Sequence, residues 1–391
     1  MNSALRPDVC IRGAGIVGQV LALLLARERL RVALVQAVGA PAAVSPTGHG
    51  DVRAYALNRA SRQLLEGLRV WPALSEATPL AAMDVHGDAE GAAQGALHFS
   101  AAELGTDALA WIVDVPALER LLADAVRYQP LIERVESPVP APLTVVCEGR
   151  DSRTRAEFGV AYDTFPYGQH AIATRMGCER AHDGIARQWF LSDDDHGDGQ
   201  GDILALLPLE GPLGRSVAVV WSTSPERAQA LAALDEPGFA HALQAVCDNA
   251  LGDMQCIAPR AVWPLQLSRA HHWVGTDRAG NAWVLAGDAA HAVHPLAGQG
   301  LSLGLADAEC LARTLHQREY FRGIGERRLL RRYERERQLD VKAMALVTDG
   351  LQRLFTAPGS WVQSLRNQGL SAFDHSGPIK QWFGRQAMGS R

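Results

Sequence analysis

Apolar positions near the start of the chain follow a strand–helix–strand pattern. Residues 8–12 and 31–35 are short, mostly apolar runs, typical of buried strands. Residues 16–30 are good helix formers and are apolar on nearly every side, with Gln19 as the only polar residue before Arg27. Such a segment predicts a buried helix. It is too short to span a membrane, which needs about 20 apolar residues.

A glycine motif lies between the first strand and the helix. Gly13, Gly15 and Gly18 form a Gly-x-Gly-x-x-Gly pattern. In a βαβ unit the first glycine permits the turn, the second lets the backbone approach a pyrophosphate, and the third lets the helix pack closely. We therefore predict a dinucleotide site. Gln36 stands where an acidic residue usually binds the ribose, so we expect weaker cofactor retention.

A second glycine site lies far down the chain. Residues 282–286 predict a strand that ends in the acidic turn Gly287-Asp288, and residues 301–315 predict a helix with regularly spaced apolar positions. Asp288 could accept hydrogen bonds from ribityl or ribose hydroxyl groups. Backbone N–H groups of the intervening loop could stabilise negative charge on a reduced flavin ring. The candidate residues of that loop are Pro295, Gly298, Gln299 and Gly300.

Composition and charge exclude several classes of protein. The 391 residues predict two or three domains. Lys and Arg number 38 against 43 Asp and Glu, which gives a net charge of −5 and argues against nucleic-acid binding. Six scattered cysteines without a CxxC pair predict reduced thiols. His291 and His294 have no carboxylate or thiol at ligand spacing, so we expect no metal site.

Taken together, these motifs resemble those of the single-component FAD-dependent aromatic hydroxylases, in particular the ubiquinone-biosynthesis hydroxylases. The string from Gly287 to Asp307 resembles the second FAD motif of that branch. Residues 51–57 resemble a segment beside the flavin, in which Arg53 would contact the cofactor. The resemblance extends to the substrate-domain strands and the C-terminal region. The segments that carry it there are 167–171, 204–209, 333–337 and 387–389.

A third motif of the family is altered in this chain. Residues 143–147 predict a strand, and Glu148-Gly149 follow where the family has Asp-Gly, with Ser152 and Arg155 downstream. The family uses this motif for FAD and for the nicotinamide donor. The resemblance therefore implies that Glu148 and Gly149 contact the cofactor, with the carboxylate moved by one methylene group.

The resemblance also implies the fold and its division into domains. We expect an α/β fold like that of p-hydroxybenzoate hydroxylase, in which a Rossmann-like FAD-binding domain carries an inserted mixed β-sheet substrate domain. Residues 1–75, 105–160 and 275–345 would form the discontinuous FAD-binding domain. Residues 76–104 and 161–274 would form the substrate domain. Residues 346–391, with Trp361, Trp382 and Phe383, would form a C-terminal helical region.

The implied activity is hydroxylation of an aromatic ring by O2 with NADH or NADPH as electron donor. The substrate would be a lipophilic, polyprenylated phenol or quinol intermediate of ubiquinone biosynthesis. Pro295 would shape the flavin face, and the backbone of Gly298, Gln299 and Gly300 would stabilise the reduced flavin. No residue stands out as a substrate base. Two alternatives stay open: another flavin oxidoreductase on this fold, or a non-catalytic flavin-binding component of a quinone-synthesis complex.

Two charged segments are interpreted as solvent-exposed. Residues 193–199 lack the alternation and closing Glu of an EF-hand, so we expect a hairpin tip between Phe190 and Ile203. Residues 318–337 contain eight Arg and four Glu, typical of an exposed charged helix, with docking to an anionic membrane surface as the alternative. We expect a cytoplasmic protein, with peripheral contact to the inner face of the cytoplasmic membrane left open.

Overall fold

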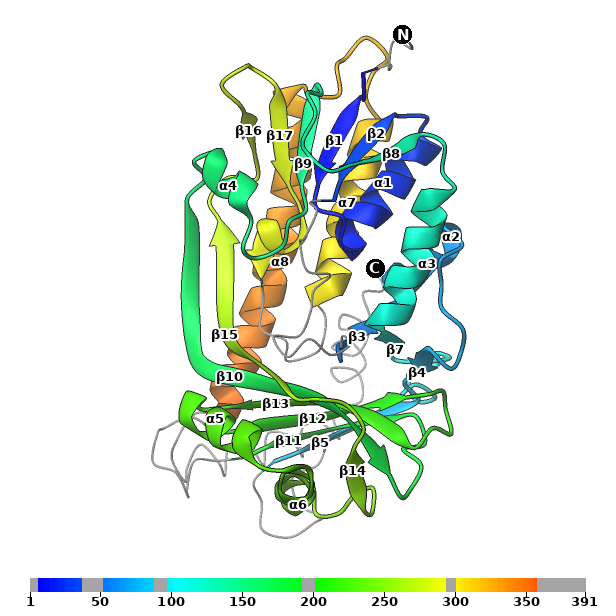
Figure 1. The fold of residues 1–391 in the computed structure, drawn as a ribbon, viewed down its shortest axis with the longest axis vertical. Coiled ribbons are helices and arrows are strands. Elements are labelled where there is room, and N and C mark those ends of the chain that lie inside the picture. Colours follow the sequence, from blue (N-terminus) through cyan, green and yellow to red (C-terminus); the bar gives the residue numbers. More distant parts are fainter. Residues whose placement is uncertain (1–5, 37–51, 88–96, 192–200, 293–299, 357–391) are drawn as a thin grey trace.

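A parallel sheet with helices packed on it forms one half of the computed structural model (Figure 1). The model describes residues 6–36, 52–87, 97–191, 201–292 and 300–356. Several predicted positions lie outside these ranges, so their predictions stay as stated. They are residues 193–199, His294, Pro295, Gly298, Gln299, Trp361, Trp382, Phe383 and residues 387–389.

The parallel sheet has the strand order β16-β17-β9-β1-β2-β8. Neighbouring strands from β17 to β8 run parallel, and β16 is antiparallel at the edge. All four strands predicted for this domain lie in it, because a buried parallel strand is recognisable as an apolar run. The bounds are β1 (Val9–Arg12), β2 (Val32–Val35), β8 (Ile132–Val135), β9 (Leu143–Val146), β16 (Val274–Thr276) and β17 (Ala282–Leu285).

Helix α1 (Ile16–Arg27) crosses from β1 to β2 and packs between α7 (Gly300–His316) and α3 (Val115–Arg127). It ends three residues earlier than predicted because Arg29 adopts a left-handed conformation (φ 61°), and the N–H of Leu30 then donates to the carbonyl of Leu25. The apolar positions predicted along α7 are all buried. Three further helices are α2 (Arg59–Gly67), α4 (Arg153–Glu157) and α8 (Arg327–Thr356).

A larger mixed sheet forms the other half, in the order β18-β15-β10-β13-β12-β11-β5-β6 with β14 beside β10. Strands β5 and β11 pair in parallel, and the other pairs are antiparallel. The bounds are β5 (Ala82–His86), β6 (Leu97–Ser100), β10 (Tyr162–Cys178), β11 (Ile185–Phe190), β12 (Ile203–Leu209), β13 (Ser216–Thr223), β14 (Met254–Cys256), β15 (Ala261–Ala270) and β18 (His291–Ala292).

One apolar face of the mixed sheet is covered by α5 (Pro225–Ala233) and α6 (Glu236–Val246). Phe190 pairs with Ile203 across β11 and β12, so the strands that flank the predicted hairpin tip are confirmed. A small antiparallel sheet of β3 (Ala54–Leu57), β7 (Trp111–Asp114) and β4 (Ala77–Pro79) lies between the two halves.

The two halves are joined by the long strands β10 and β15 (Figure 1). Strand β18, which follows the Gly287-Asp288 turn, pairs with β15 through Ala292 and Ser268. The second glycine site is therefore tied directly to the mixed sheet. This architecture confirms the predicted fold class, while the domain boundaries stay predictions.

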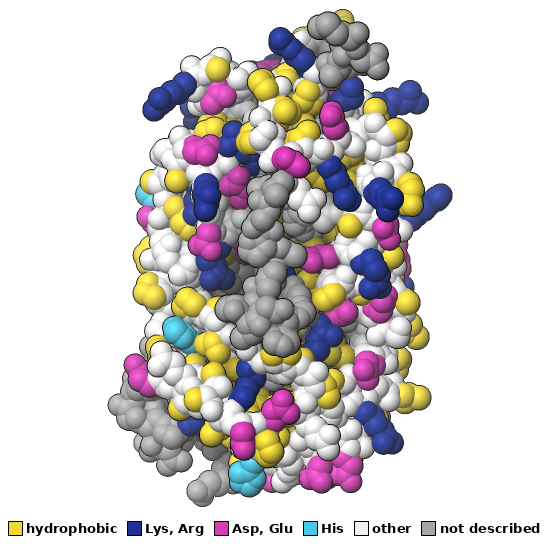
Figure 2. Space-filling view, viewed as in Figure 1, with side chains coloured by type: hydrophobic (Ala, Val, Ile, Leu, Met, Phe, Trp, Pro, Cys, Tyr) yellow, Lys and Arg dark blue, Asp and Glu magenta, His cyan; other side chains and the backbone are white. Residues whose placement is uncertain are grey.

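The surface carries charges of both signs, as Figure 2 shows for one face. In the described part of the chain, no helix has the length and hydrophobicity of a membrane-spanning segment. All six cysteines are free, and four of them are buried. Burial raises the pKa of Cys178 to about 12 and that of Cys310 to about 11, so both are protonated thiols at neutral pH.

Candidate functional site

Two glycines of the first motif are required by close packing. Gly13 has φ 111°, and a Cβ atom on it would lie 2.4 Å from the carbonyl oxygen of Cys147. A Cβ atom on Gly18 would lie 1.9 Å from the carbonyl oxygen of Gly13. These two residues therefore let α1, β1 and β9 approach one another at the carboxyl ends of the strands.

Gly15 has a different environment. Among the residues that the structure describes, no surrounding heavy atom lies within 4 Å of the position that its Cβ would occupy. Gly15 is also the N-cap of α1, and its end of the helix has no side-chain cap. Gly149, after β9, and Gly300, at the start of α7, likewise have no surrounding heavy atom of the described chain within 4 Å of their Cβ positions. A helix N-terminus that opens onto free space is the arrangement that a pyrophosphate needs, so these residues fit a dinucleotide.

The first and second motifs pack against each other through Val17 of α1. Its methyl group lies 3.4 Å from the position that a Cβ would take on Gly287 and 2.7 Å from that on Gly304. Gly287 has φ 62° and starts a single 3-10 turn that contains Asp288. Two segments that are far apart in the sequence thus form one continuous structure.

Asp288 lies in the 3-10 turn at this junction. Its side chain is exposed, yet enough protein surrounds the carboxylate that desolvation raises its pKa. The positive charges of His291, Arg150 and Arg53 offset part of this increase. The predicted residue Arg53 is therefore close enough to Asp288 to act on it electrostatically. An exposed carboxylate can accept hydrogen bonds from a polyhydroxylated ligand.

The backbone around Arg53 is held by Arg175 of β10, which sequence reasoning missed. The Arg175 guanidinium donates to the carbonyl groups of Val52 (3.3 Å) and Arg53 (3.4 Å) and forms an ion pair with Asp114. Arg53 itself lies 3.5 Å from the hydroxyl group of Tyr55. Arg175 of the mixed sheet therefore holds the backbone of the Arg53 segment in place.

Glu148 uses its carboxylate within its own turn. It accepts hydrogen bonds from the hydroxyl group of Ser152 (2.8 Å) and from the N–H (3.0 Å) and hydroxyl group (2.6 Å) of Thr154. Ser152 in turn caps α4. The longer side chain therefore stabilises the turn after β9, and contact between Glu148 and the cofactor stays a prediction.

Arg155 links the third motif to the second. Its buried guanidinium donates to the carbonyl groups of Ala289 (3.1 Å) and Arg150 (2.8 Å) and lies 3.4 Å from the ring centre of Tyr162. The Tyr162 hydroxyl group donates to the carbonyl of Asp288 (3.1 Å). Tyr162 was not among the predicted site residues, because its role depends on the pairing of β10 and β15.

The prediction of an exposed charged helix over residues 318–337 is wrong for part of that segment. The helix begins only at Arg327, and Glu334 and Arg337 are buried, 9% and 4% exposed. Their burial follows from polar partners on other elements, including Asp307 on α7. A helical projection carries the missed signal, because Arg337 shares a face with the apolar residues Leu330, Tyr333 and Val341.

Gln36 follows β2 directly, as predicted, and its N–H donates to the carbonyl of Val135 (2.9 Å). Its side chain is exposed. The described ranges contain no group of three or more His, Cys, Asp or Glu residues that could hold a metal ion. His291, weighed above as a metal ligand, instead contacts Asp307.

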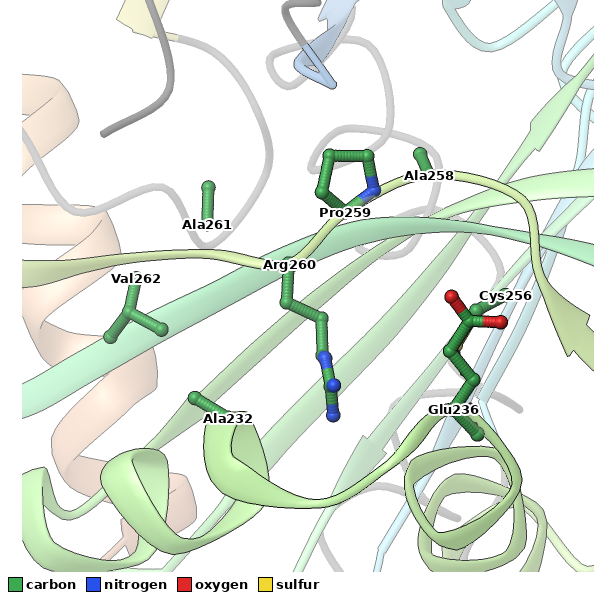
Figure 3. Close-up of a pocket in the computed structure, with 8 residues that line it drawn as sticks. All are labelled: Ala232, Glu236, Cys256, Ala258, Pro259, Arg260, Ala261 and Val262. Atoms are coloured by element: carbon green, nitrogen blue, oxygen red, sulfur yellow. Dashed lines mark hydrogen bonds between the residues drawn. The ribbon is translucent and has the colours of Figure 1, made fainter. Parts of the chain in front are cut away.

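A separate hollow of about 520 Å³ lies between α5, α6 and β15 (Figure 3). Arg260 points across it and donates to the carbonyl groups of Leu231 and Leu234. None of the predicted cofactor residues within the described ranges lines it. Its lining residues are Ala232, Glu236, Cys256, Ala258, Pro259, Arg260, Ala261 and Val262.

Comparison with known proteins identifies the family. A family model described as "FAD binding domain" matches residues 125–348, more than half of the chain. The chain is 31% identical to a ubiquinone hydroxylase, UbiL, of Rhodospirillum rubrum, over 98% of this chain and 90% of that protein. It is 28% identical to the 3-demethoxyubiquinol 3-hydroxylase of Escherichia coli, over 98% of each.

Among solved structures, p-nitrophenol 4-monooxygenase PnpA of Pseudomonas putida has the same fold. The TM-score is 0.72 at 17% identity, over 98% of each chain. The family predicted from the motifs is thereby confirmed. The chain belongs to the FAD-dependent aromatic hydroxylases, in the branch of the ubiquinone-biosynthesis hydroxylases.

Proposed function

We propose that this FAD-dependent monooxygenase hydroxylates the aromatic ring of a polyprenylated phenol or quinol intermediate of ubiquinone biosynthesis. The observation that carries the proposal is the similarity to two ubiquinone-pathway hydroxylases over 98% of the chain, because it includes the mixed sheet as well as the flavin motifs. A match limited to the FAD-binding residues would indicate the cofactor but would not indicate the substrate.

Each flavin motif would bind a different part of FAD. Backbone N–H groups at the start of α1, exposed by the bare Cα of Gly15, would bind the pyrophosphate. Asp288 would accept hydrogen bonds from the ribityl chain, beside Arg53. Pro295 would shape the flavin face, and the backbone of residues 298–300 would stabilise the reduced ring. When bound, FAD supplies the oxygen activation and the hydroxyl transfer.

We also propose NADH or NADPH as the electron donor, with no separate nicotinamide domain. The test is aerobic turnover by the FAD-loaded protein with either donor and a prenylated phenol, in ¹⁸O2. Donor oxidation that depends on the phenol, together with one ¹⁸O atom in the product ring, is the expected result. Oxidation without ring hydroxylation would favour another flavin oxidoreductase, and absence of both would favour a non-catalytic flavin-binding component.

Gln36→Glu is expected to tighten FAD binding by about 3- to 10-fold. A carboxylate at the end of β2 would form charge-assisted hydrogen bonds to the ribose, which are roughly twice as strong as neutral ones. Titration of the apoprotein with FAD, followed by flavin fluorescence, measures the change. Gln36→Leu should weaken binding, and an unchanged affinity in both variants would place the ribose elsewhere.

A peripheral membrane contact is proposed for the start of α8. Five arginines are exposed there, and α8 has no acidic residue in its first turn to oppose the positive end of the helix dipole. Within the described structure none of the five forms an ion pair. The adjacent Tyr320 and Phe321 are 98% and 67% exposed. We call these residues the arginine patch; its five arginines are Arg327, Arg328, Arg331, Arg332 and Arg335.

The arginine patch would bind an anionic lipid surface. Each arginine near that surface would contribute roughly 1 kcal/mol to the free energy of binding. Sedimentation with phosphatidylglycerol/phosphatidylcholine (1:1) vesicles tests this. Glutamine at positions 327, 328, 331 and 332 is expected to abolish binding. Glutamine at four other exposed arginines is the matched control and should preserve it: Arg29, Arg69, Arg127 and Arg180. Equal losses in both variants would indicate a general charge effect and no defined surface.

A further inference from the structure

A buried carboxylate joins three separate segments behind the second flavin motif. Asp307 on α7 is fully buried. One of its oxygens accepts the N–H of Gly287 (2.8 Å) and lies 2.7 Å from Nε2 of His291. The other oxygen accepts Nε–H of Arg337 on α8 (2.8 Å). The residues on both sides of Asp288 are thus held by one side chain.

Helix α8 makes further polar contacts to the same region. The Tyr333 hydroxyl group donates to the carbonyl of Leu285 (2.9 Å), at the end of β17. The carboxylate of Glu334 accepts the backbone N–H of Trp273 (2.8 Å). Arg337 also contacts Asp340 (2.7 Å) and the carbonyl of Leu303 (3.4 Å). The buried face of α8 therefore packs on the motif through directional bonds as well as apolar contacts.

The charge of Asp307 depends on its basic partners. Burial alone would raise the pKa of Asp307, but the charges of His291 and Arg337 hold it below its usual value, so the carboxylate is ionised. A fully buried ionised carboxylate loses much stabilisation if one of its donors is removed. If α8 moves away, Asp307 loses Arg337, and its remaining donors belong to the Gly287–His291 turn.

We propose that Asp307 and Arg337 form a latch that couples the docking of α8 to the conformation of the Asp288 turn, and hence to FAD affinity. Both are positioning residues, since neither is predicted to touch the cofactor. The inference rests on the proposed role of Asp288 in FAD binding. It extends that role to a helix in which no cofactor residue is predicted.

Thermodynamic linkage makes the coupling reciprocal. If docking of α8 favours FAD binding, FAD binding must favour docking of α8 by the same factor. FAD should therefore slow amide hydrogen exchange in residues 333–340 as well as in residues 285–292. In the apoprotein, loss of the latch should raise exchange in both segments together.

The test compares Asp307→Asn and Arg337→Lys with Leu311→Ala. Leu311 is fully buried on α7, so its truncation destabilises the same helix without touching the latch. We expect Asp307→Asn to weaken FAD binding at least 10-fold more than Leu311→Ala, even where their Tm values are lowered equally. Arg337→Lys, which keeps the charge, should give an intermediate loss and covers the case in which Asp307→Asn fails to fold.

The hydrogen-exchange measurements test the coupling between α8 and the Asp288 turn independently of the proposed role of Asp288 in FAD binding. If residues 285–292 and 333–340 respond independently in the apo variants, the latch is wrong. If both loosen together while FAD affinity follows Tm alone, the coupling to FAD is wrong. A wild-type protein that binds no FAD would overturn the proposed function, and the apo exchange pattern would still decide whether the latch exists.

Discussion

Gly18→Ala is expected to yield little or no folded protein. The new methyl carbon would lie 1.9 Å from the carbonyl oxygen of Gly13, and both are backbone-anchored. Overpacking of a core costs about 1–3 kcal/mol when side chains can adjust, and here a strand and a helix must separate. Alanine favours a helix over glycine by only about 1 kcal/mol, which cannot offset the clash. Soluble yield and thermal unfolding followed by circular dichroism measure the loss.

Gly15→Ala is the matched control within the same motif. The position has open space around it and an extended backbone conformation that alanine adopts (φ −73°, ψ −178°). The fold should persist with little change in Tm, while FAD affinity falls by at least about 10-fold because the methyl group fills the pyrophosphate cradle. If Gly15→Ala binds FAD as the wild type does, the pyrophosphate is not bound at the start of α1.

The sequence predicted those parts of the fold whose signals are local. Residues 8–36 carry apolar runs and glycines at fixed spacing, and the observed β1, α1 and β2 lie within them. Gly13 and Gly18 are needed for packing that any Rossmann-like unit has. Only the end of α1 was misplaced, because the left-handed conformation of Arg29 is not encoded in the hydrophobic pattern.

Interactions between segments that are far apart in the sequence could not be predicted from such local signals. Arg337 looks like one more exposed arginine until α8 is placed beside α7, where Asp307 is its partner. Arg175 can hold the Arg53 segment only because the fold brings β10 next to residues 52 and 53. The resemblance implies a cofactor contact for Glu148, but it does not reveal the hydrogen bonds that Glu148 accepts from Ser152 and Thr154.

Asp288→Ala is expected to reduce FAD affinity by about 100-fold or more. Hydrogen bonds to a charged group contribute about 1.5–3 kcal/mol each, and two lost bonds to the ribityl chain correspond to at least two factors of ten. The apoprotein should fold normally, since the Asp288 side chain is exposed. Flavin content after desalting and FAD titration of the apoprotein give the two readouts.

Asp288→Asn should change FAD affinity and the stability of the apoprotein in opposite directions. Desolvation raises the pKa of Asp288 in the folded apoprotein above the usual 3.8, so the folded state binds this proton more tightly than the unfolded chain does. As pH rises through the window between these two pKa values, this group lowers the free energy of unfolding. At neutral pH the charge therefore destabilises the apoprotein, and Asp288→Asn should raise its Tm while weakening FAD binding.

The pH dependence of FAD binding supplies the final check. The wild type should lose affinity on acidification, because protonation of Asp288 removes the carboxylate that accepts the ribityl hydroxyl groups, and it does so at a higher pH than an ordinary aspartate would. Asp288→Asn should lack this dependence. If this variant instead lowers the Tm of the apoprotein and keeps the wild-type pH dependence, Asp288 supports the fold and another group binds the ribityl chain.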